Sequence, residues 1–197
     1  MSAGVATIAD VKNGELEGLV EELSVVSAEA REVFGRLTRA QLNWKPSAES
    51  WSVGQCFDHL IQTNRCFFPE MERVAAGTFK SSLWARVSPF SGLIGRLIIG
   101  SLDPVKGRKT KAARVFLPAS SDVDADVMER FASHQEELAR RMRATAGVDL
   151  RRTMVTSPVT AVATYSLLDA YRIIVGHERK HFEQARRVTE EAGFPRA

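Results

Sequence analysis

Apolar residues recur at every third or fourth position over four long stretches of the sequence, and this spacing constrains the fold more than any other feature. It places the apolar side chains on one face of an α-helix. The expected helices are residues 11–38, 52–77, 121–146 and 166–191, with Pro69 bending the second or shortening it to about Phe68. Ser52 with Gln55, and Ser166 with Asp169, stand at the positions of a capping box and mark the starts of the second and fourth helices. Helices of this kind bury their apolar faces against one another. The sequence therefore predicts an all-α protein, a four-helix bundle, with one domain over residues 1–197.

The segments between these stretches are irregular. Residues 41–52 contain a proline and small polar residues, which indicate a loop, and their two tryptophans should pack back onto the bundle. Glycines and prolines make residues 77–120 a long, irregular insertion between the second and third helices. Its apolar run, 93–99, is too short to span a membrane, and a short helix over a pocket or a partner surface is one interpretation. Residues 153–164 are rich in β-branched residues, so an extended conformation of this loop is an alternative interpretation.

Composition and cysteine usage favour a soluble, cytoplasmic protein. The chain of 197 residues is 44% hydrophobic and 26% charged, with a formal net charge of +3. Met1 to Asp10 lack the basic start and apolar stretch of a secretory signal. Cys56 and Cys66 would lie roughly 15 Å apart on one helix, too far for a disulfide. Free thiols agree with a reducing compartment.

The histidines carry the clearest chemical signal. Two of the four, His177 and His181, stand four residues apart in the last expected helix, in an H-E-x-x-H pattern. Residues i and i+4 share a helix face about 5–6 Å apart at Cβ, so two imidazoles with this spacing can bind one metal ion. His59 lies on the flank of the apolar stripe of the second helix, and metal sites in bundles are built from facing helices. The sequence therefore predicts a three-histidine metal site.

Each candidate residue also has an ordinary structural interpretation. The His177 and His181 pair can be partly exposed helix histidines, and His59 can be a core histidine bonded to a backbone carbonyl. Glu178 is either a surface carboxylate or a catalytic base or hydrogen-bond partner near the ligands. His134, on the apolar stripe of the third helix, is better interpreted as a buried or substrate-pocket histidine than as a fourth ligand. A zincin-type protease fits less well, because the 16 residues after His181 hold no third histidine.

Three motifs resemble the DinB-like superfamily of four-helix-bundle metalloproteins. They are Leu42-Asn43-Trp44-Lys45-Pro46, then Trp51-Ser52-Val53-Gly54-Gln55 followed by His59-Leu60, and finally His177-Glu178-Arg179-Lys180-His181-Phe182-Glu183-Gln184. The resemblance implies an up-down-down-up bundle and a divalent ion, zinc or nickel, bound at the positions of His59, His177 and His181. It also implies that some members use a low-molecular-weight thiol as co-substrate in S-transfer. Residues 77–120 do not align with the family pattern.

A small-molecule enzyme is the function that we expect. A metal held by three neutral histidines keeps an open position, where it could activate water for hydrolysis or bind a thiol as thiolate. The alternatives are a metal-binding bundle without catalysis and a bundle that binds nucleic acid or another partner. Nucleic acid is disfavoured, because the basic residues exceed the acidic ones by only three, 27 against 24. The apolar run at 93–99 suggests a homodimer, the commonest closed assembly.

Overall fold

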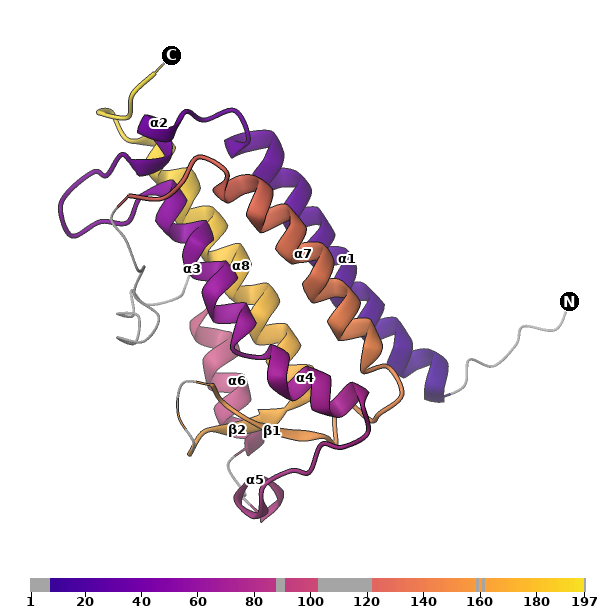
Figure 1. The fold of residues 1–197 in the computed structure, drawn as a ribbon. Coiled ribbons are helices and arrows are strands. Elements are labelled where there is room, and N and C mark those ends of the chain that lie inside the picture. The colour runs from indigo at the N-terminus through magenta and orange to yellow at the C-terminus, as the bar shows by residue number, and fades with distance from the viewer. Residues whose placement is uncertain (1–7, 88–90, 103–121, 159, 161, 197) are drawn as a thin grey trace, which may run out of the picture.

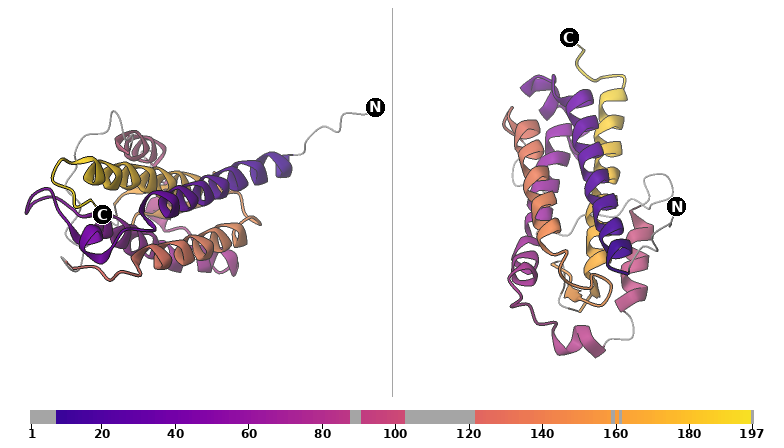
Figure 2. Two further views of the ribbon diagram at one scale, coloured as in Figure 1. Left: turned by 90° about the horizontal axis from the view of Figure 1, so that it is seen from above. Right: turned by 90° about the vertical axis from the view of Figure 1, so that its right-hand side faces the viewer.

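Four long helices form the body of the protein. The computed structural model describes residues 8–87, 91–102, 122–158, 160 and 162–196. The long helices are α1 (Ile8–Phe34), α3 (Val53–Arg65), α7 (Val127–Ala144) and α8 (Leu167–Glu190), and they lie side by side (Figure 1). Each of α1 and α3 packs against both α7 and α8, and Figure 2 shows the same arrangement from two further directions. The mostly helical fold expected from the apolar spacing is confirmed.

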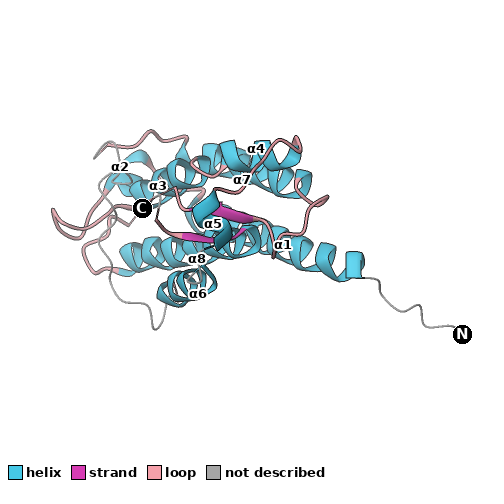
Figure 3. Ribbon diagram, turned by 90° about the horizontal axis from the view of Figure 1, so that it is seen from below, coloured by secondary structure: helices cyan, strands magenta, loops and turns pink. Residues whose placement is uncertain are grey.

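Shorter elements gather around this body. The helices are α2 (Arg39–Asn43), α4 (Phe68–Ala75), α5 (Leu83–Val87) and α6 (Ser91–Ser101). Two strands, β1 (Met154–Thr156) and β2 (Thr164–Ser166), pair in antiparallel register with Val155 opposite Tyr165 (Figure 3). The two strands lie at the two ends of the β-branched segment 153–164 and form a small hairpin. The prediction of an extended conformation was therefore correct for these residues, and the fold is not purely helical. No helix among the described residues has the length and apolar character needed to cross a membrane.

The first helix ends earlier than its apolar pattern predicts. It stops at Phe34, and Thr38 caps a separate helix, α2, through a capping box with Gln41. The Thr38 Oγ1 accepts the Gln41 N–H at 3.3 Å, and the Gln41 side chain accepts the Thr38 N–H at 2.8 Å. The expected loop over 41–52 consequently begins inside α2. The error arises because apolar spacing continues through Leu37, which still packs on the core after the helix has ended.

The second expected helix begins where the sequence indicates and is interrupted ahead of Pro69, earlier than the expected end at about Phe68. Ser52 and Gln55 form the expected capping box at the start of α3. The helix stops at Arg65, and a new helix, α4, starts at Phe68 with Pro69 in its first turn. Proline has no N–H to donate and clashes with the preceding turn, which explains the break.

The third helix begins later than expected, at Val127 instead of residue 121 or 122. The preceding chain is held against α2, because the Asn43 side chain accepts the Val123 N–H at 2.7 Å and donates to its carbonyl at 2.8 Å. Both backbone groups of Val123 thereby have a partner outside the helix. A long-range contact of this kind leaves no trace in local apolar spacing.

The last helix begins at the expected cap but with one difference. The Ser166 Oγ accepts the Asp169 N–H at 3.0 Å. The reciprocal bond of a capping box does not form; the Asp169 carboxylate instead pairs with Arg172 at 3.2 Å.

A Cβ at Gly95 would lie 3.0 Å from the Asp169 Oδ2, so glycine permits the close approach of α6 to α8 at this point.

The described part of the insertion, residues 77–87 and 91–102, is more regular than expected. Its apolar run forms α6, in which Ile94 and Ile98 pack against the core while Leu93 and Leu97 are exposed. A short helix was one interpretation of this run, and it is the correct one. The basic stretch 106–114 lies outside the described residues.

The core consists of two clusters of buried apolar side chains with polar residues between them. Along α7, one cluster contains Val127 and Phe131 and the other contains Leu138 and Met142. Along α8 the two clusters are separated in the same way, between Val175 and Phe182. The gap between the clusters contains the polar layer of the bundle, which is defined by its buried histidine, amide and carboxylate residues: His59, Asn64, His134, Gln135, Glu178 and His181.

Candidate metal centre

Three histidines from two helices converge at one edge of the polar layer. His59 lies on α3, and His177 and His181 lie one turn apart on α8. The Nε2 atom of His177 is 3.3 Å from that of His59 and 3.0 Å from that of His181. One ring nitrogen from each residue lies within 4.8 Å of the others. This is the grouping that the sequence predicts, and three imidazole nitrogens facing a common point form a suitable donor set for a divalent transition metal.

Burial keeps this group in the form that binds metal. His59 and His181 are buried, and His177 is half-buried. Burial lowers the pKa of His177 and of His181 well below its ordinary value, and the neighbouring histidines and Lys180 lower both further. Two of the three rings are therefore neutral near pH 7, and a neutral imidazole has a lone pair available for a metal.

Trp51 and the end of α6 lie beside the group. The indole of Trp51 stacks on the His181 ring, with centroids 5.4 Å apart and planes at 12°, and meets the His59 ring edge-on at 4.8 Å. The Lys180 Nζ, on the same helix as His177 and His181, donates to the Ser101 carbonyl at the end of α6, at 3.1 Å. The loop before α3 and the last turn of α6 thus both touch the helix segment that carries the histidines.

Glu178 points away from solvent, into the centre of the bundle. Its side chain is fully buried. The Glu178 Oε1 accepts hydrogen bonds from Asn64 Nδ2 of α3 at 2.8 Å and from Gln135 Nε2 of α7 at 2.7 Å. Burial raises the pKa of this carboxyl to about 7, although both hydrogen bonds and Arg179 act in the opposite direction. The interpretation of Glu178 as a surface carboxylate was therefore wrong, and its carboxyl links three helices.

Comparison with known families agrees with this architecture. The family model of the DinB superfamily matches residues 22–185. The chain belongs to the DinB superfamily. Neither the curated proteins nor the solved structures include a match to the chain. The matched residues include α3, α7 and α8 as far as Ala185, so all three members of the histidine group lie within the DinB region.

His134 lies apart from the three-histidine group of this DinB chain. Its ring stacks on Phe68 of α4, with centroids 5.4 Å apart, and both of its ring nitrogens are buried without a hydrogen-bond partner among the described residues. Burial lowers the pKa of His134 to about 4, Arg65 and Arg141 lower it too, and Glu137 opposes them. His134 is thus a buried neutral histidine, one of its two sequence interpretations, and it is not a member of the metal-ligand group.

Sequence reasoning did not identify Asn64 and Gln135 as partners of Glu178. A signal was present, because each amide stands on the apolar stripe of its helix, where a leucine would be usual. A polar residue at such a position needs a buried partner. The identity of that partner depends on how α3, α7 and α8 meet, which single-helix patterns do not specify.

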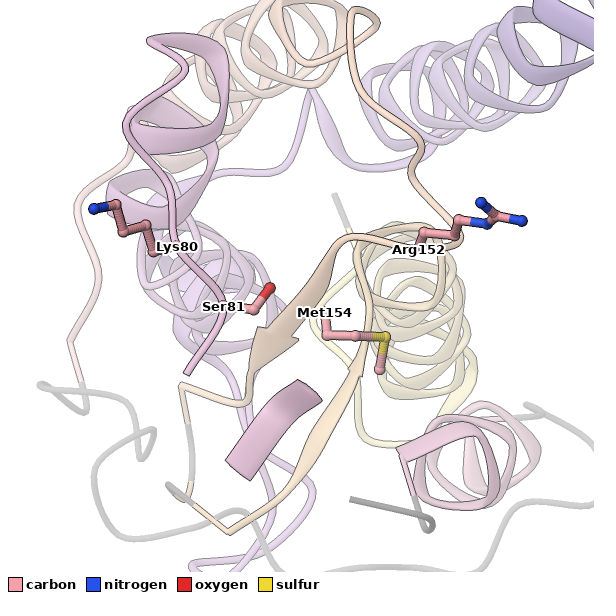
Figure 4. A pocket seen from close by; sticks show the side chains of 4 residues that line it. All are labelled: Lys80, Ser81, Arg152 and Met154. Carbon is pink, nitrogen blue, oxygen red and sulfur yellow. The ribbon is translucent and has the colours of Figure 1, made fainter. Parts of the chain in front are cut away.

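A surface cavity elsewhere on the molecule is lined by Lys80, Ser81, Arg152 and Met154 (Figure 4). It lies beside the hairpin, and the side chains of Lys80 and Arg152 point away from one another. None of the three grouped histidines lines it. The chemistry of the imidazole group therefore identifies the candidate site better than the presence of a cavity does.

Proposed function

We propose that the protein binds one divalent metal ion, zinc or nickel, through His59, His177 and His181. The observation that carries this proposal is the convergence of three Nε2 atoms from α3 and α8. Without a metal, each of these Nε2 contacts is a hydrogen bond only if one of the two rings carries its proton on Nε2, whereas a shared cation can accept the lone pairs of all three nitrogens at once. Membership of the DinB superfamily is compatible with this site.

The proposed activity is that of a small-molecule enzyme, either a thiol S-transferase with a low-molecular-weight thiol as co-substrate or a hydrolase. Three neutral imidazoles would leave a bound ion its full charge and an open position, where it could lower the pKa of a water or a thiol. The chain contributes a water-poor setting, since His59 and His181 are buried. Lys180 adds a fixed positive charge beside the histidines, which favours an anionic reactant. A base role for Glu178 and a substrate-pocket role for His134 remain part of this proposal.

Turnover assays on the metal-loaded protein test the enzymatic proposal. One panel pairs low-molecular-weight thiols with electrophilic substrates, and a second contains esters and amides. Activity in either panel should require the ion and should be lost in a His177→Gln variant, which keeps a polar side chain but removes an imidazole. Stoichiometric metal with no metal-dependent turnover in either panel would leave metal binding intact and refute catalysis of these two kinds.

A non-catalytic bundle that binds metal, nucleic acid or another partner is the alternative. The ion pairs of the arginines are evidence on nucleic-acid binding. Arg141 pairs with Glu137 at 2.8 Å, and Arg143 pairs with Glu17 at 2.9 Å. Arg151 pairs with Glu15 at 2.6 Å. Acidic partners of this kind compete with phosphates for the arginines that an anionic polymer would need. We therefore favour a small-molecule reactant over nucleic acid.

The proposal also covers the order of the helices, the assembly and the cellular location of the protein. We propose an up-down-down-up order for α1, α3, α7 and α8, and a homodimer formed through the exposed residues Leu93 and Leu97 of α6. Cys56 and Cys66 are both free thiols, which supports the proposal of a cytoplasmic location.

A further inference from the structure

Trp51 touches two of the three grouped histidines from a fixed backbone position. It directly precedes Ser52, the N-cap of α3, whose Oγ accepts the Gln55 N–H at 3.1 Å while the Gln55 side chain accepts the Ser52 N–H at 3.2 Å. The loop therefore enters the helix at a defined angle. The half-buried indole lies nearly parallel to the His181 ring and edge-on to the His59 ring.

His181 lacks the usual hydrogen bond at its second ring nitrogen among the described residues. A metal-binding histidine is normally held by a hydrogen bond to its second ring nitrogen. The Nδ1 atom of His181 is buried, and it has no hydrogen-bond partner among the described residues. Hydrogen bonding with the Gln184 side chain acts to raise the pKa of His181, although no described residue lies in full hydrogen-bond geometry at Nδ1. Rotation of the ring about its Cβ–Cγ bond is therefore opposed by packing, and the parallel partner in that packing is Trp51.

We propose that Trp51 is a positioning residue for the three-histidine group: its indole holds His181 and His59 in the orientation in which their Nε2 atoms meet that of His177. This inference rests on the proposed metal binding. Stacked and edge-on aromatic pairs have preferred geometries that aliphatic side chains lack. The role therefore depends on the flat aromatic ring, and an aliphatic side chain of similar hydrophobicity cannot supply it.

Two substitutions of Trp51 distinguish a role in orienting the histidine rings from a role in only shielding them from water. Trp51→Phe keeps an aromatic face for His181, whereas Trp51→Leu keeps apolar cover but removes the stack. Trp44 provides a matched control in the same loop, because its indole packs edge-on against Phe194, with centroids 5.6 Å apart, and makes no ring contact with the histidines. Trp44→Leu should leave metal binding unchanged.

Chelator competition with Zn²⁺ measures the affinity of the wild type and these variants. We expect Trp51→Leu to bind zinc about 10- to 100-fold more weakly, the range found when groups that orient metal ligands are removed. Trp51→Phe should stay close to the wild type. Equal affinity of the wild type and a folded Trp51→Leu variant would refute positioning, whereas a wild type that binds no zinc would refute the proposed metal site itself.

Tryptophan fluorescence gives a second test that does not depend on the folding of Trp51→Leu. A Trp44→Phe, Trp84→Phe variant has Trp51 as its only tryptophan. Binding of Ni²⁺, which quenches nearby indoles, should reduce its emission and reach saturation at one equivalent. A Trp51→Phe, Trp84→Phe variant, which keeps Trp44, should respond much less. Unchanged Trp51 emission on stoichiometric Ni²⁺ loading would mean that the indole does not lie against the site, and the proposal would fail.

Discussion

His134 should make the stability of the protein depend on pH. Its two ring nitrogens are buried with no hydrogen-bond partner in the described part of the chain, and its pKa is lowered to about 4. In the unfolded chain the same imidazole titrates near 6.5. Between these values the unfolded state is protonated and the folded state is neutral, so acid favours unfolding. Protonation of His134 therefore leaves the free energy of unfolding almost unchanged above about pH 7 and lowers it as the pH falls toward 4.

The magnitude follows from the two pKa values. A difference between 6.5 and about 4, at about 1.4 kcal/mol for each pKa unit, corresponds to about 3 kcal/mol once the pH lies below both. About 2 kcal/mol of this should be lost between pH 7 and pH 5. The charged groups around His134 are Arg65, Arg141 and Glu137, and the two cations oppose its protonation.

Urea unfolding at several pH values, with a chelator present, measures this contribution. A His134→Leu variant should lose about 2 kcal/mol less than the wild type between pH 7 and pH 5. His134→Gln should flatten the profile equally, but only the leucine variant should also gain stability at pH 7, because it removes buried polar atoms that have no partner. Parallel pH profiles for the wild type and both variants would refute the assignment of His134 as a buried neutral group.

Three further predictions concern the core, the assembly and the thiols. Asn64→Leu removes a donor to the buried carboxylate and should cost about 1–3 kcal/mol in urea unfolding; an unchanged midpoint would rule out the network. Leu97→Glu should convert a dimer to a monomer in light scattering while Val25→Glu, on another exposed apolar residue, should not; a monomeric wild type would exclude the dimer. A thiol reagent should label Cys66 in the native protein and leave buried Cys56, whose pKa is raised to about 12, unlabelled until unfolding; rapid labelling of both would contradict the packing of α3.

The features that local sequence specifies were predictable. The capping box of Ser52 and Gln55 and the interruption of the helix near Pro69 depend on residues within a few positions of one another. The capping box forms as expected, and the interruption occurs close to the expected position, with α3 ending at Arg65. The spacing of His177 and His181 required only a helix to place both rings on one face. His59 was also placed correctly, because its position on the flank of an apolar stripe directs it toward the neighbouring helix.

The features that depend on contacts between distant segments were not predictable. The start of α7 depends on hydrogen bonds between Asn43 and Val123, and no helix propensity encodes them. The interior position of Glu178 depends on amides from two other helices. On a single helical wheel this glutamate lies among apolar residues such as Ile174 and Phe182, which is a sign of burial, but its hydrogen-bond partners become evident only when the other helices are in place.

Metal content tests the central claim most directly. Purified wild-type protein, loaded with Zn²⁺ or Ni²⁺ and freed of excess ion, should retain about one ion per chain. His59→Ala and His181→Ala should each lose it, since either leaves only two of the three nitrogens. His134→Leu, which changes a histidine outside the group, should retain it. Stoichiometric metal in both ligand variants, or none in the wild type, would contradict the three-histidine site.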